Sequence, residues 1–443
     1  MGIKAVSTPI LASETAVGFW RGTSILAWQL WVAFGIAVGF AFNLIFYTAE
    51  DRTAFALVMG APLVPSLMLL VLVIWFCDES PRYLMRESSP NYNPQKAYEN
   101  LRKLRQTELQ ALRDIYLIKK SVDQEEYAGG ERARAKTATA TSLTQTLSEF
   151  LHQYYELFRE RRLRNALISS SIVALAQQLC GINVLAFYSG TLFSRAGAGR
   201  LTAMLYSLGF GLVNFVFCLP AIRTIDTLGR RKWLTLTLPV MAVLMACAAA
   251  SFSAQDERTR IVLLAVFLFL FAAAYSPGMG PIPFTVASES FPLSHREAGA
   301  AFAIAVNLGF AGLLSLFFPS INSGLGDGGA LALFSGFNVV AFALVFLLLE
   351  ETKRRSLEDL DFVFAVSKRR FMEYQVGTYL PWLFRRYVLG RREEKPSLYL
   401  DLTEGGPLPG ERQGVGDNGE GLGDTQWQAP VWRETAVSEN EHS

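Results

Sequence analysis

The sequence predicts an all-α fold: a polytopic membrane helical bundle of about eight transmembrane helices. Hydrophobic residues make up 51% of the 443 residues, and they gather in eight long runs without Asp, Glu, Lys, Arg or His. A helix needs roughly 20 apolar residues to cross the hydrocarbon core, and every run reaches that length. Helices of a large soluble core would instead carry charges on their outward faces. The runs are 23–49, 53–77, 165–194, 201–222, 233–254, 261–288, 298–319 and 328–349.

Basic residues divide the connections between the runs into two classes. The segment 78–164 holds sixteen Lys and Arg, and a second basic cluster lies at 353–393. The connection after the fourth run is also basic, whereas the alternate connections hold two basic residues or fewer. Positively charged loops remain in the cytosol. We therefore expect a multi-pass protein of the plasma membrane, with 78–164 and the C-terminal tail cytosolic.

Composition further divides the chain into five segments. The first two runs lie in 1–77, a cytosolic helical loop forms 78–164, and six runs fill 165–349. A cytosolic tail spans 350–402, in which 366–393 interleaves aromatic residues with Arg and Lys, and favours a helix lying on the anionic inner leaflet over a fully soluble tail. The Gly-rich, polar stretch 403–443 is predicted to be disordered.

Uncharged amides interrupt several of the runs. An unsatisfied amide in hydrocarbon is costly, so each one either bonds across a helix interface or lines a cavity. Single amides such as Asn43 and Asn338 are typical of helix–helix packing, but three within seven residues favour a cavity. The amides are Gln29, Asn43, Gln177, Gln178, Asn183, Asn214, Asn307 and Asn338.

Two runs contain residues that break helices. On a regular helix Gln177 and Asn183 would lie about 120° apart, and Gly181 between them permits a break that brings them to one side. The sixth run contains "SPGMGPIPFTVASES". Its prolines remove backbone donors and disfavour helix in the preceding residues. This run therefore predicts a hinge with exposed carbonyls beside Phe284.

The chemistry of these runs indicates an uncharged ligand. A site for an ionic substrate normally carries an opposing charge or the end of a half-helix. Amides both donate and accept hydrogen bonds, as sugar hydroxyls require, and an aromatic face covers the C–H side of a sugar ring. A small, neutral, hydroxyl-rich molecule is the expected partner besides the lipid bilayer, and nucleic acid is not expected.

Acidic and basic residues occur together at the predicted cytosolic ends of the spans. Solvated charge and positive-inside topology explain the basic members, but not the carboxylates. Exposed pairs contribute at most about 1 kcal/mol each, yet several together would bias a two-state equilibrium by a few kcal/mol. We interpret them as a cytosolic charge latch, formed by Glu14 with Arg21, Glu79 with Arg82, Asp226 with Arg230 and Arg231, and Glu289 with Arg296.

Enzymatic chemistry is not expected. The three histidines are scattered, and the sequence contains no metal-ligand cluster, nucleophile–base motif or phosphate loop. No catalytic residue, metal or cofactor is predicted.

Several motifs resemble those of the sugar porter family of the major facilitator superfamily, and the resemblance covers nearly all of 8–365. "ETAVGFWRG" is similar to E-x-x-P-x-x-x-R-G with Val17 at the proline, and "DESPRYL" to P-E-S-P-R-[WF]-L with Asp78 at the first proline. "QQLCGIN" is similar to Q-Q-x-x-G-x-N, and "DTLGRR" to D-x-x-G-R-R. "GPIPFTVASESFP" resembles G-P-x-P-W-x-x-x-x-E-x-x-P.

The last motif and the tail also resemble this family. "EETKRRSLEDLD" is similar to P-E-T-K-G-x-x-L-E-E, with Glu350 and Arg354 departing, while "WQLWVAFGI" and the aromatic–basic tail look especially like fungal members. The resemblance implies a sugar bound between two bundles. Phe284 stands where tryptophan is usual, Leu308 where tryptophan usually follows Asn307, and Ser276 where glutamate is common. The implied binding residues are Gln29, Gln177, Gln178, Asn183, Asn214, Phe284 and Asn307, and the implied gate residues are Tyr188, Pro281 and Pro283.

The resemblance further implies a partial major-facilitator fold. Glu14 and Arg21 match the link before the family's fifth helix, so 1–77 is expected to hold the end of helix four and helices five and six. Helices one to four are expected to be missing, and because the coupling carboxylate of proton-coupled members commonly lies on helix one, no coupling residue is named.

The expected function is transport of a neutral sugar or polyol by alternating access, with symport of protons as one form of it. The alternatives are a non-transporting membrane sensor or accessory protein, and an inactive truncated transporter.

Overall fold

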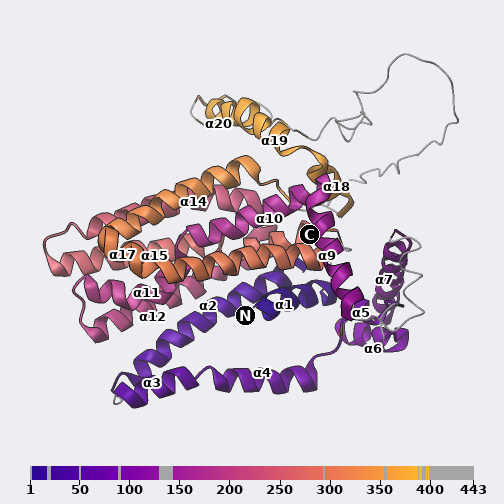
Figure 1. Ribbon diagram of the computed structural model, residues 1–443, viewed down its shortest axis with the longest axis horizontal. Coiled ribbons are helices and arrows are strands. Elements are labelled where there is room, and N and C mark those ends of the chain that lie inside the picture. The colour runs from indigo at the N-terminus through magenta and orange to yellow at the C-terminus, as the bar shows by residue number, and fades with distance from the viewer. Residues whose placement is uncertain are drawn as a thin grey trace, which may run out of the picture. The chain divides into compact units, whose positions relative to one another are not determined.

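The computed structural model shows an all-helical chain (Figure 1), with no strand among the residues it describes. Residues Met1–Leu398 form one compact unit, and the predicted disordered stretch 403–443 lies outside the described residues. The described residues are 2–16, 21–48, 51–87, 91–128, 143–292, 295–353, 357–387, 389–391, 396 and 398.

Seven helical stretches of the described chain are long and apolar enough to cross a membrane. They coincide with the predicted runs, because an uncharged run of this length forms a helix whose every side chain tolerates lipid. The stretches comprise α2 (Arg21–Ile45), α3 with α4 (Asp51–Gly60 and Leu63–Phe76), α10 with α11 (Arg161–Leu179 and Ile182–Arg195), α12 (Arg200–Cys218), α14 (Arg230–Ser251), α15 (Glu257–Tyr275) and α17 (Arg296–Leu348).

The longest helix, α17, contains two of the predicted spans. A straight helix of its 53 residues would be about 80 Å long, well over the roughly 30 Å of the hydrocarbon core. Gly326 has φ 73° and ψ 168°, which breaks the helix. On either side of this break, Asn307 donates to the carbonyl of Ala174 and Asn338 to that of Cys180. Both halves of α17 therefore lie against α10, and the chain reverses at Gly326, which accounts for about eight spans.

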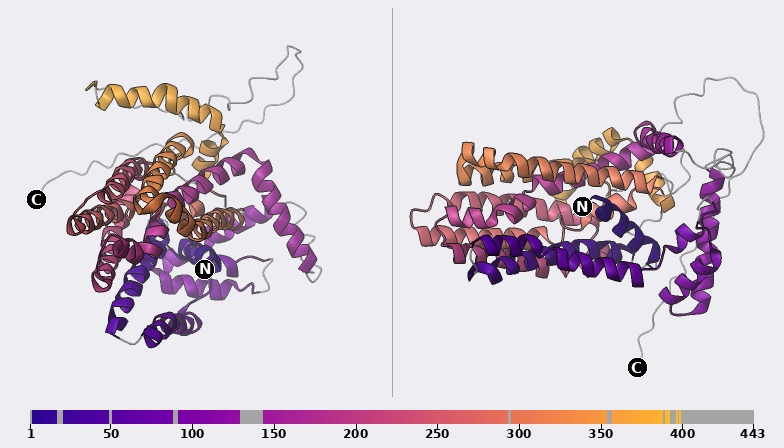
Figure 2. Two further views of the ribbon diagram at one scale, coloured as in Figure 1. Left: turned by 60° about the vertical axis from the view of Figure 1, so that its left-hand side comes forward. Right: turned by 60° about the horizontal axis from the view of Figure 1, so that its bottom comes forward.

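The core lies among α10, α11, α12, α14, α15 and α17, whose inward side chains are fully buried. Figure 2 shows these helices side by side in two further views, and α2 packs against α12. No residue of α4 is buried. Its side chains therefore face outward along the whole helix, as those of a lipid-facing span do.

Short helices connect and follow the spans. The loop contains α5 (Pro81–Leu84), α6 (Pro94–Leu104), α7 (Glu108–Ala128) and α9 (Leu143–Arg159). Helix α1 (Gly2–Thr15) precedes the first span, α13 (Ala221–Leu228) precedes α14, and α16 (Ile282–Glu289) follows α15. The tail forms α18 (Leu357–Ala365), α19 (Lys368–Tyr374), a π-helical turn (Gln375–Tyr379) and α20 (Leu380–Tyr387). The loop predicted to be helical therefore does contain helices, which are interrupted at Arg105 and Glu160.

A buried ion pair within the loop positions Arg105, which bonds the loop to α1. Arg105 Nε lies 2.6 Å from Asp114 Oδ2, and the two side chains are only 7% and 14% exposed. Arg105 Nη1 also donates to the carbonyl of Thr15 at 3.1 Å. Burial raises the pKa of Asp114, but hydrogen bonds and charge from Arg105 and Arg113 outweigh it and leave that pKa below 3.8.

Candidate functional site

The break predicted between α10 and α11 is present. Gly181 has φ 87°, a left-handed conformation that favours glycine. A Cβ atom at this position would also lie 2.9 Å from the ring of Phe334. Glycine is therefore required here on two counts, and the helix restarts at Ile182 in a new direction, with Gln177 and Gln178 before the break and Asn183 after it.

The break predicted in the sixth run is also present. Helix α15 ends at Tyr275 and α16 begins at Ile282, with Pro281 at its N-cap and Pro283 in its first turn. The turn between them exposes two carbonyls, those of Met279 and Gly280. These oxygens accept hydrogen bonds from Gln177 Nε2 at 2.8 and 2.9 Å, so the exposed carbonyls of one broken span are bound by an amide of the other.

Gln177 lies at the centre of a hydrogen-bonded network. Its Nε2 also donates to Tyr275 Oη at 3.0 Å, and its Oε1 accepts from Asn307 Nδ2 at 2.7 Å. Asn307 Nδ2 further donates to the carbonyl of Ala174 at 3.0 Å. The Gln177 amino group has two hydrogens but three acceptors within reach, so one of those contacts is available for exchange.

The remaining predicted amides surround this network. Asn183 Nδ2 donates to Gln178 Oε1 at 2.7 Å, and Ser276 Oγ donates to Asn214 Oδ1 at 2.7 Å. Gln29, on α2, packs on the turn between α15 and α16, since a Cβ atom at Gly280 would lie 3.3 Å from its Nε2. Together with Asn307 of α17, amides from five helices therefore lie around the two breaks.

Hydrogen-bonding capacity remains unused at these amides. Within the described part of the chain, the Gln29 amide, Gln178 Nε2, Asn183 Oδ1, Asn214 Nδ2 and Asn307 Oδ1 have no hydrogen-bond partner. Amide atoms at membrane depth are costly unless water or a ligand bonds to them. The set therefore offers both donors and acceptors to a polar, uncharged guest.

An aromatic pair adjoins the amides. The rings of Phe284 and Trp28 meet edge to face, with centroids 6.3 Å apart. Sequence reasoning missed Trp28, although its position next to Gln29 in "WQLW" was a usable signal. It also missed Tyr275, whose buried hydroxyl accepts from Gln177.

Tyr188 lies at a different place, on a small cavity of about 100 Å³ between α11 and α17. Its hydroxyl donates to the carbonyl of Ser315 at 3.1 Å, and its ring lies 4.9 Å from that of Phe318. Arg195 and Asp327 line the same cavity and pair at 3.2 Å. This geometry closes α11 against α17 at one end of the bundle.

One part of the predicted latch centres on Arg230. Its guanidinium makes two bonds to Glu289, at 2.8 and 3.2 Å, and lies 2.9 Å from Asp226. The side chains of Arg230 and Glu289 are only 5% and 17% exposed, so this pair is more buried than the sequence suggested. Arg231, expected beside Asp226, instead places its guanidinium over the rings of three aromatic residues, Phe346, Phe371 and Tyr379.

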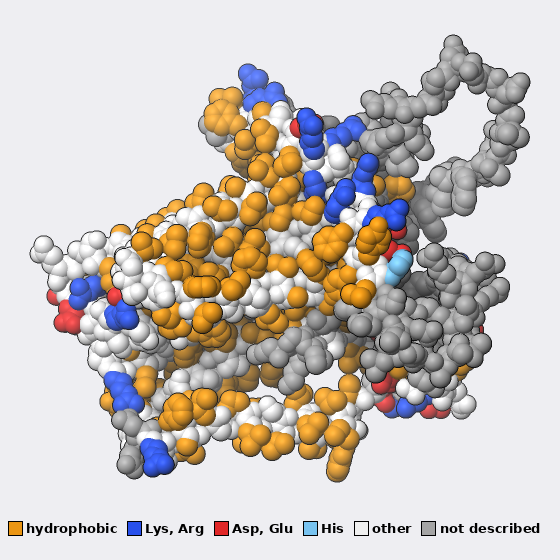
Figure 3. All heavy atoms as spheres, in the orientation of Figure 1, with side chains coloured by type: hydrophobic (Ala, Val, Ile, Leu, Met, Phe, Trp, Pro, Cys, Tyr) orange, Lys and Arg blue, Asp and Glu red, His pale blue; other side chains and the backbone are white. Residues whose placement is uncertain are grey.

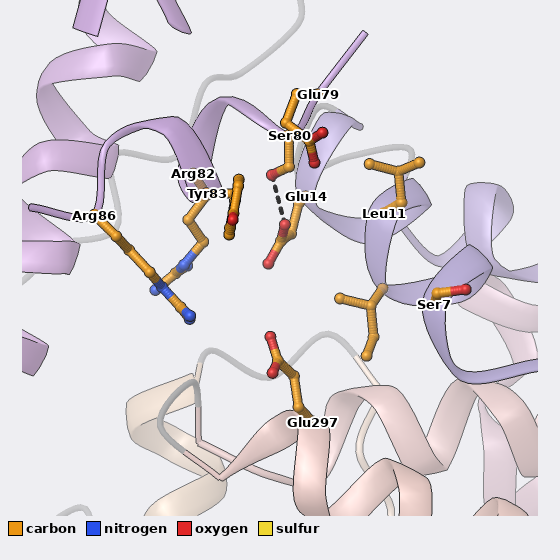
Figure 4. Close-up of a pocket in the computed structure, with 10 residues that line it drawn as sticks. Ser7, Leu11, Glu14, Glu79, Ser80, Arg82, Tyr83, Arg86 and Glu297 are labelled. Atoms are coloured by element: carbon orange, nitrogen blue, oxygen red, sulfur yellow. Dashed lines mark hydrogen bonds between the residues drawn. The ribbon is translucent and has the colours of Figure 1, made fainter. Parts of the chain in front are cut away.

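A second part of the predicted latch lines a cavity of about 540 Å³ (Figure 4), to which Glu14, Glu79 and Arg82 contribute together with Arg86 and Glu297. Within it, Glu14 accepts a hydrogen bond from Ser80 Oγ at 2.6 Å. Acidic and basic side chains from three parts of the chain thus face one another.

Two predicted latch residues remain. Arg296 is buried at the start of α17, and the side chain of Arg21 lies outside the described residues.

Comparison with known proteins gives consistent results. A family model described as "Sugar (and other) transporter" matches residues 1–364. Putative polyol transporter 2 of Arabidopsis thaliana is 26% identical over 82% of this chain and 70% of that protein. The glucose transporter GlcP of Staphylococcus epidermidis is 28% identical over 80% and 72% of the two chains. Myo-inositol transporter 1 of Cryptococcus neoformans is 28% identical over 82% and 62%.

The fold also matches that of solved structures. The proton:xylose symporter XylE bound to 6-bromo-6-deoxy-D-glucose superposes with a TM-score of 0.65 at 23% identity, over 82% of this chain and 71% of that one. The predicted membrane bundle with a major-facilitator fold is thereby confirmed.

Proposed function

Because the chain belongs to the family of sugar (and other) transporters, we propose that it moves a neutral sugar or polyol across a membrane by alternating access. The observation that supports this most strongly is the set of amides gathered at two broken spans with donors and acceptors unused. The broken segments 172–190 and 271–288 contain no charged residue. A neutral solute therefore fits them better than an ion does.

The hydrogen bonds offered to the solute are complementary to hydroxyl groups. Gln178 Nε2 and Asn214 Nδ2 donate, whereas Asn183 Oδ1 and Asn307 Oδ1 accept. Gln177 exchanges one of its carbonyl contacts for a solute hydroxyl, and the released carbonyl accepts a hydrogen bond from another solute hydroxyl, so the network reorganises without leaving a buried group unpaired. The rings of Phe284 and Trp28 cover the C–H face of the solute.

Opposite ends of the bundle supply the gates. Tyr188 closes one end through Ser315, and the Arg230–Glu289 pair closes the other. Glu289 is the last residue of α16, so opening this pair frees the segment that follows the Gly/Pro turn. Pro281 and Pro283 let that segment swing about the turn.

The orientation in the membrane follows from the basic segments. We place 78–164 and the tail in the cytosol of a plasma-membrane protein, with the Arg230 end inward and the Tyr188 end outward. The proton coupling of the related xylose symporter leads us to include proton symport in the proposal, without assigning a residue to it. Proton-coupled uptake would increase as the external pH is lowered.

Uptake of labelled solutes tests the proposal. A host that lacks its own hexose and polyol carriers is transformed with this chain, and the accumulation of a panel of hexoses and polyols is measured beside an empty-vector control. Surface biotinylation establishes that the protein reaches the membrane. Accumulation of at least one panel member above the vector supports the proposal, and no accumulation with the protein at the surface refutes it.

A sensor that binds a sugar without moving it is the second candidate. The observation that favours it is α4, because within the described chain this span has no buried residue and so lacks a packing partner in a rocking bundle. Binding of a panel sugar to the purified protein, with no exchange of that sugar across proteoliposomes, would select the sensor.

A further inference from the structure

The described residues that follow the last span, 350–353, 357–387 and 389–391, are here called the arm, which is bound to the bundle at its beginning. Glu350, which stands where the family motif usually has proline, is 2% exposed. Its carboxylate lies 2.6 and 2.7 Å from Lys368 Nζ and accepts a hydrogen bond from Ser169 Oγ at 2.6 Å. Lys368 Nζ also donates to the carbonyl of Leu348, the last residue of α17, at 2.9 Å. The start of α19 is therefore held at the level where the last span ends.

A second contact holds the arm farther along. The guanidinium of Arg231 lies 5.4 Å from the ring centroid of Phe346 and 5.5 Å from those of Phe371 and Tyr379. Its Nη2 donates to the carbonyl of Phe346 at 2.8 Å. Cation–π contacts at these distances attach the arm to the bundle. The preceding residue, Arg230, holds Glu289, so neighbouring residues of α14 hold the arm and the gate.

The outward face of the arm is apolar. Val376, Leu380, Phe384 and Tyr387 are 54%, 49%, 57% and 75% exposed. At 100° per residue, the three that lie in α20 fall within a stripe about 60° wide. Trp382, on the opposite side of α20, is only 6% exposed and packs toward the bundle. Hydrophobic and basic side chains gather on this arm in Figure 3.

Basic side chains lie on the side of α20 away from the apolar stripe. Arg385 and Arg386 flank Trp382 there, with the Arg386 guanidinium 5.3 Å from the Trp382 ring centroid, and Arg391 follows the helix; all three arginines are exposed. An apolar stripe opposite a basic face is typical of a helix that lies in the membrane interface, where the stripe enters the acyl boundary and the arginines reach the phosphates. Because Lys368 bonds the carbonyl of Leu348 at the end of the last span, the arm begins where that span leaves the hydrocarbon core, within reach of lipid headgroups.

We propose that the arm binds the surface of a bilayer rich in anionic lipids, through the stripe of Leu380, Phe384 and Tyr387 and the arginines on the opposite side of α20. Because Arg231 and Glu350 fix the arm to the bundle, the lipid headgroups then contribute to holding α14 and α17 together next to the Arg230–Glu289 gate. The lipid composition of the leaflet thus acts on the gate through the arm.

Site-directed spin labelling of the full chain tests the proposal without measuring transport, so its outcome is separate from that of the uptake assay. On a background with Cys77→Ser and Cys247→Ser, which removes the two cysteines that are not buried, single labels are introduced by Phe384→Cys, by Tyr387→Cys and, as the matched control, by Glu373→Cys. Glu373 is exposed and polar and lies one helix earlier, in α19. The protein is reconstituted in nanodiscs of phosphatidylcholine with and without phosphatidylserine.

We expect labels at Phe384 and Tyr387 to be accessible to oxygen and shielded from a water-soluble nickel chelate, and the label at Glu373 to show the reverse. Replacing Arg385 and Arg386 with Gln should weaken the phosphatidylserine-dependent part of the arm's affinity for the bilayer by about fivefold per arginine, because each basic residue contributes roughly 1 kcal/mol.

Chelate accessibility at both Phe384 and Tyr387 in either lipid overturns the proposal. Shielding that is unchanged when phosphatidylserine is omitted also overturns it, because an anionic surface then contributes nothing to the binding of the arm. The two label sites guard against one variant that fails to fold, which gel filtration would reveal.

Discussion

Replacing Gln177 with alanine tests whether this amide binds the solute or only joins helices. The side chain bonds the carbonyls of Met279 and Gly280, the hydroxyl of Tyr275 and the amide of Asn307. We expect Gln177→Ala to weaken the binding of the transported solute. It should leave membrane insertion unchanged, since alanine is at least as apolar as glutamine.

The magnitude follows from these contacts. A buried acceptor that loses its donor costs about 1–3 kcal/mol. The carbonyls of Met279 and Gly280 lose their donor here. Because water entering the vacated space can bond to them, each costs about 1 kcal/mol, the lower end of that range, so the free energy of unfolding should fall by about 2 kcal/mol. Loss of one or two hydrogen bonds to the solute, at about 1 kcal/mol each, weakens its binding about fivefold to thirtyfold.

Asn338→Ala is the matched control. Asn338 is a fully buried amide of the same bundle, and it donates to the carbonyls of Phe334 and Cys180 at 2.8 and 3.2 Å. Its deletion should reduce stability by a similar amount without changing solute affinity, as expected of an amide that only joins helices. The assay combines equilibrium binding of the solute to purified protein with chemical unfolding in detergent. The reasoning is refuted if both variants lose stability and neither loses affinity.

Three further perturbations test other parts of the account. Gly181→Ala should lower the unfolding temperature, because the left-handed conformation costs roughly 1 kcal/mol and the new Cβ meets Phe334; an unchanged temperature in detergent would contradict the requirement for glycine. Glu289→Gln should destabilise the closed end by up to about 3 kcal/mol, because it leaves Arg230 buried without its bidentate partner. Amide hydrogen exchange in α16 should then accelerate, and unchanged exchange would show that this pair does not act as a latch. The pKa of Asp114 lies below 3.8 in the folded chain, so its contribution to stability is present above about pH 4 and is lost as the pH falls through the folded pKa. The protection of α7 amides from hydrogen exchange should fall in that pH range, and Asp114→Asn should show the lower protection already at pH 7.

The spans and their two breaks could be predicted because they depend on local sequence. Length and absence of charge determine which runs cross a membrane, and membership of a transporter family agrees with the prediction of a transporter without enzymatic chemistry. Gly181 and the Gly/Pro segment after Tyr275 impose backbone conformations that act within a few residues. Both breaks lie where the sequence placed them.

The partners of the amides could not be predicted, because they depend on packing between distant segments. Gln177 and Asn307 are 130 residues apart, and only the packing of the first half of α17 against α10 brings them together. The same reason applies to Arg231. Its charge suggested a carboxylate partner, whereas the fold places three aromatic rings around it.

The role of each amide in binding remains a proposal. It is tested most directly by determining the structure with the tightest-binding panel sugar or polyol present. The account predicts solute hydroxyls within hydrogen-bond distance of Gln177 and of at least two among Gln178, Asn183, Asn214 and Asn307, with a contact from Gln177 to Met279 or Gly280 released. Solute bound elsewhere, with every one of the present amide bonds retained, would contradict it.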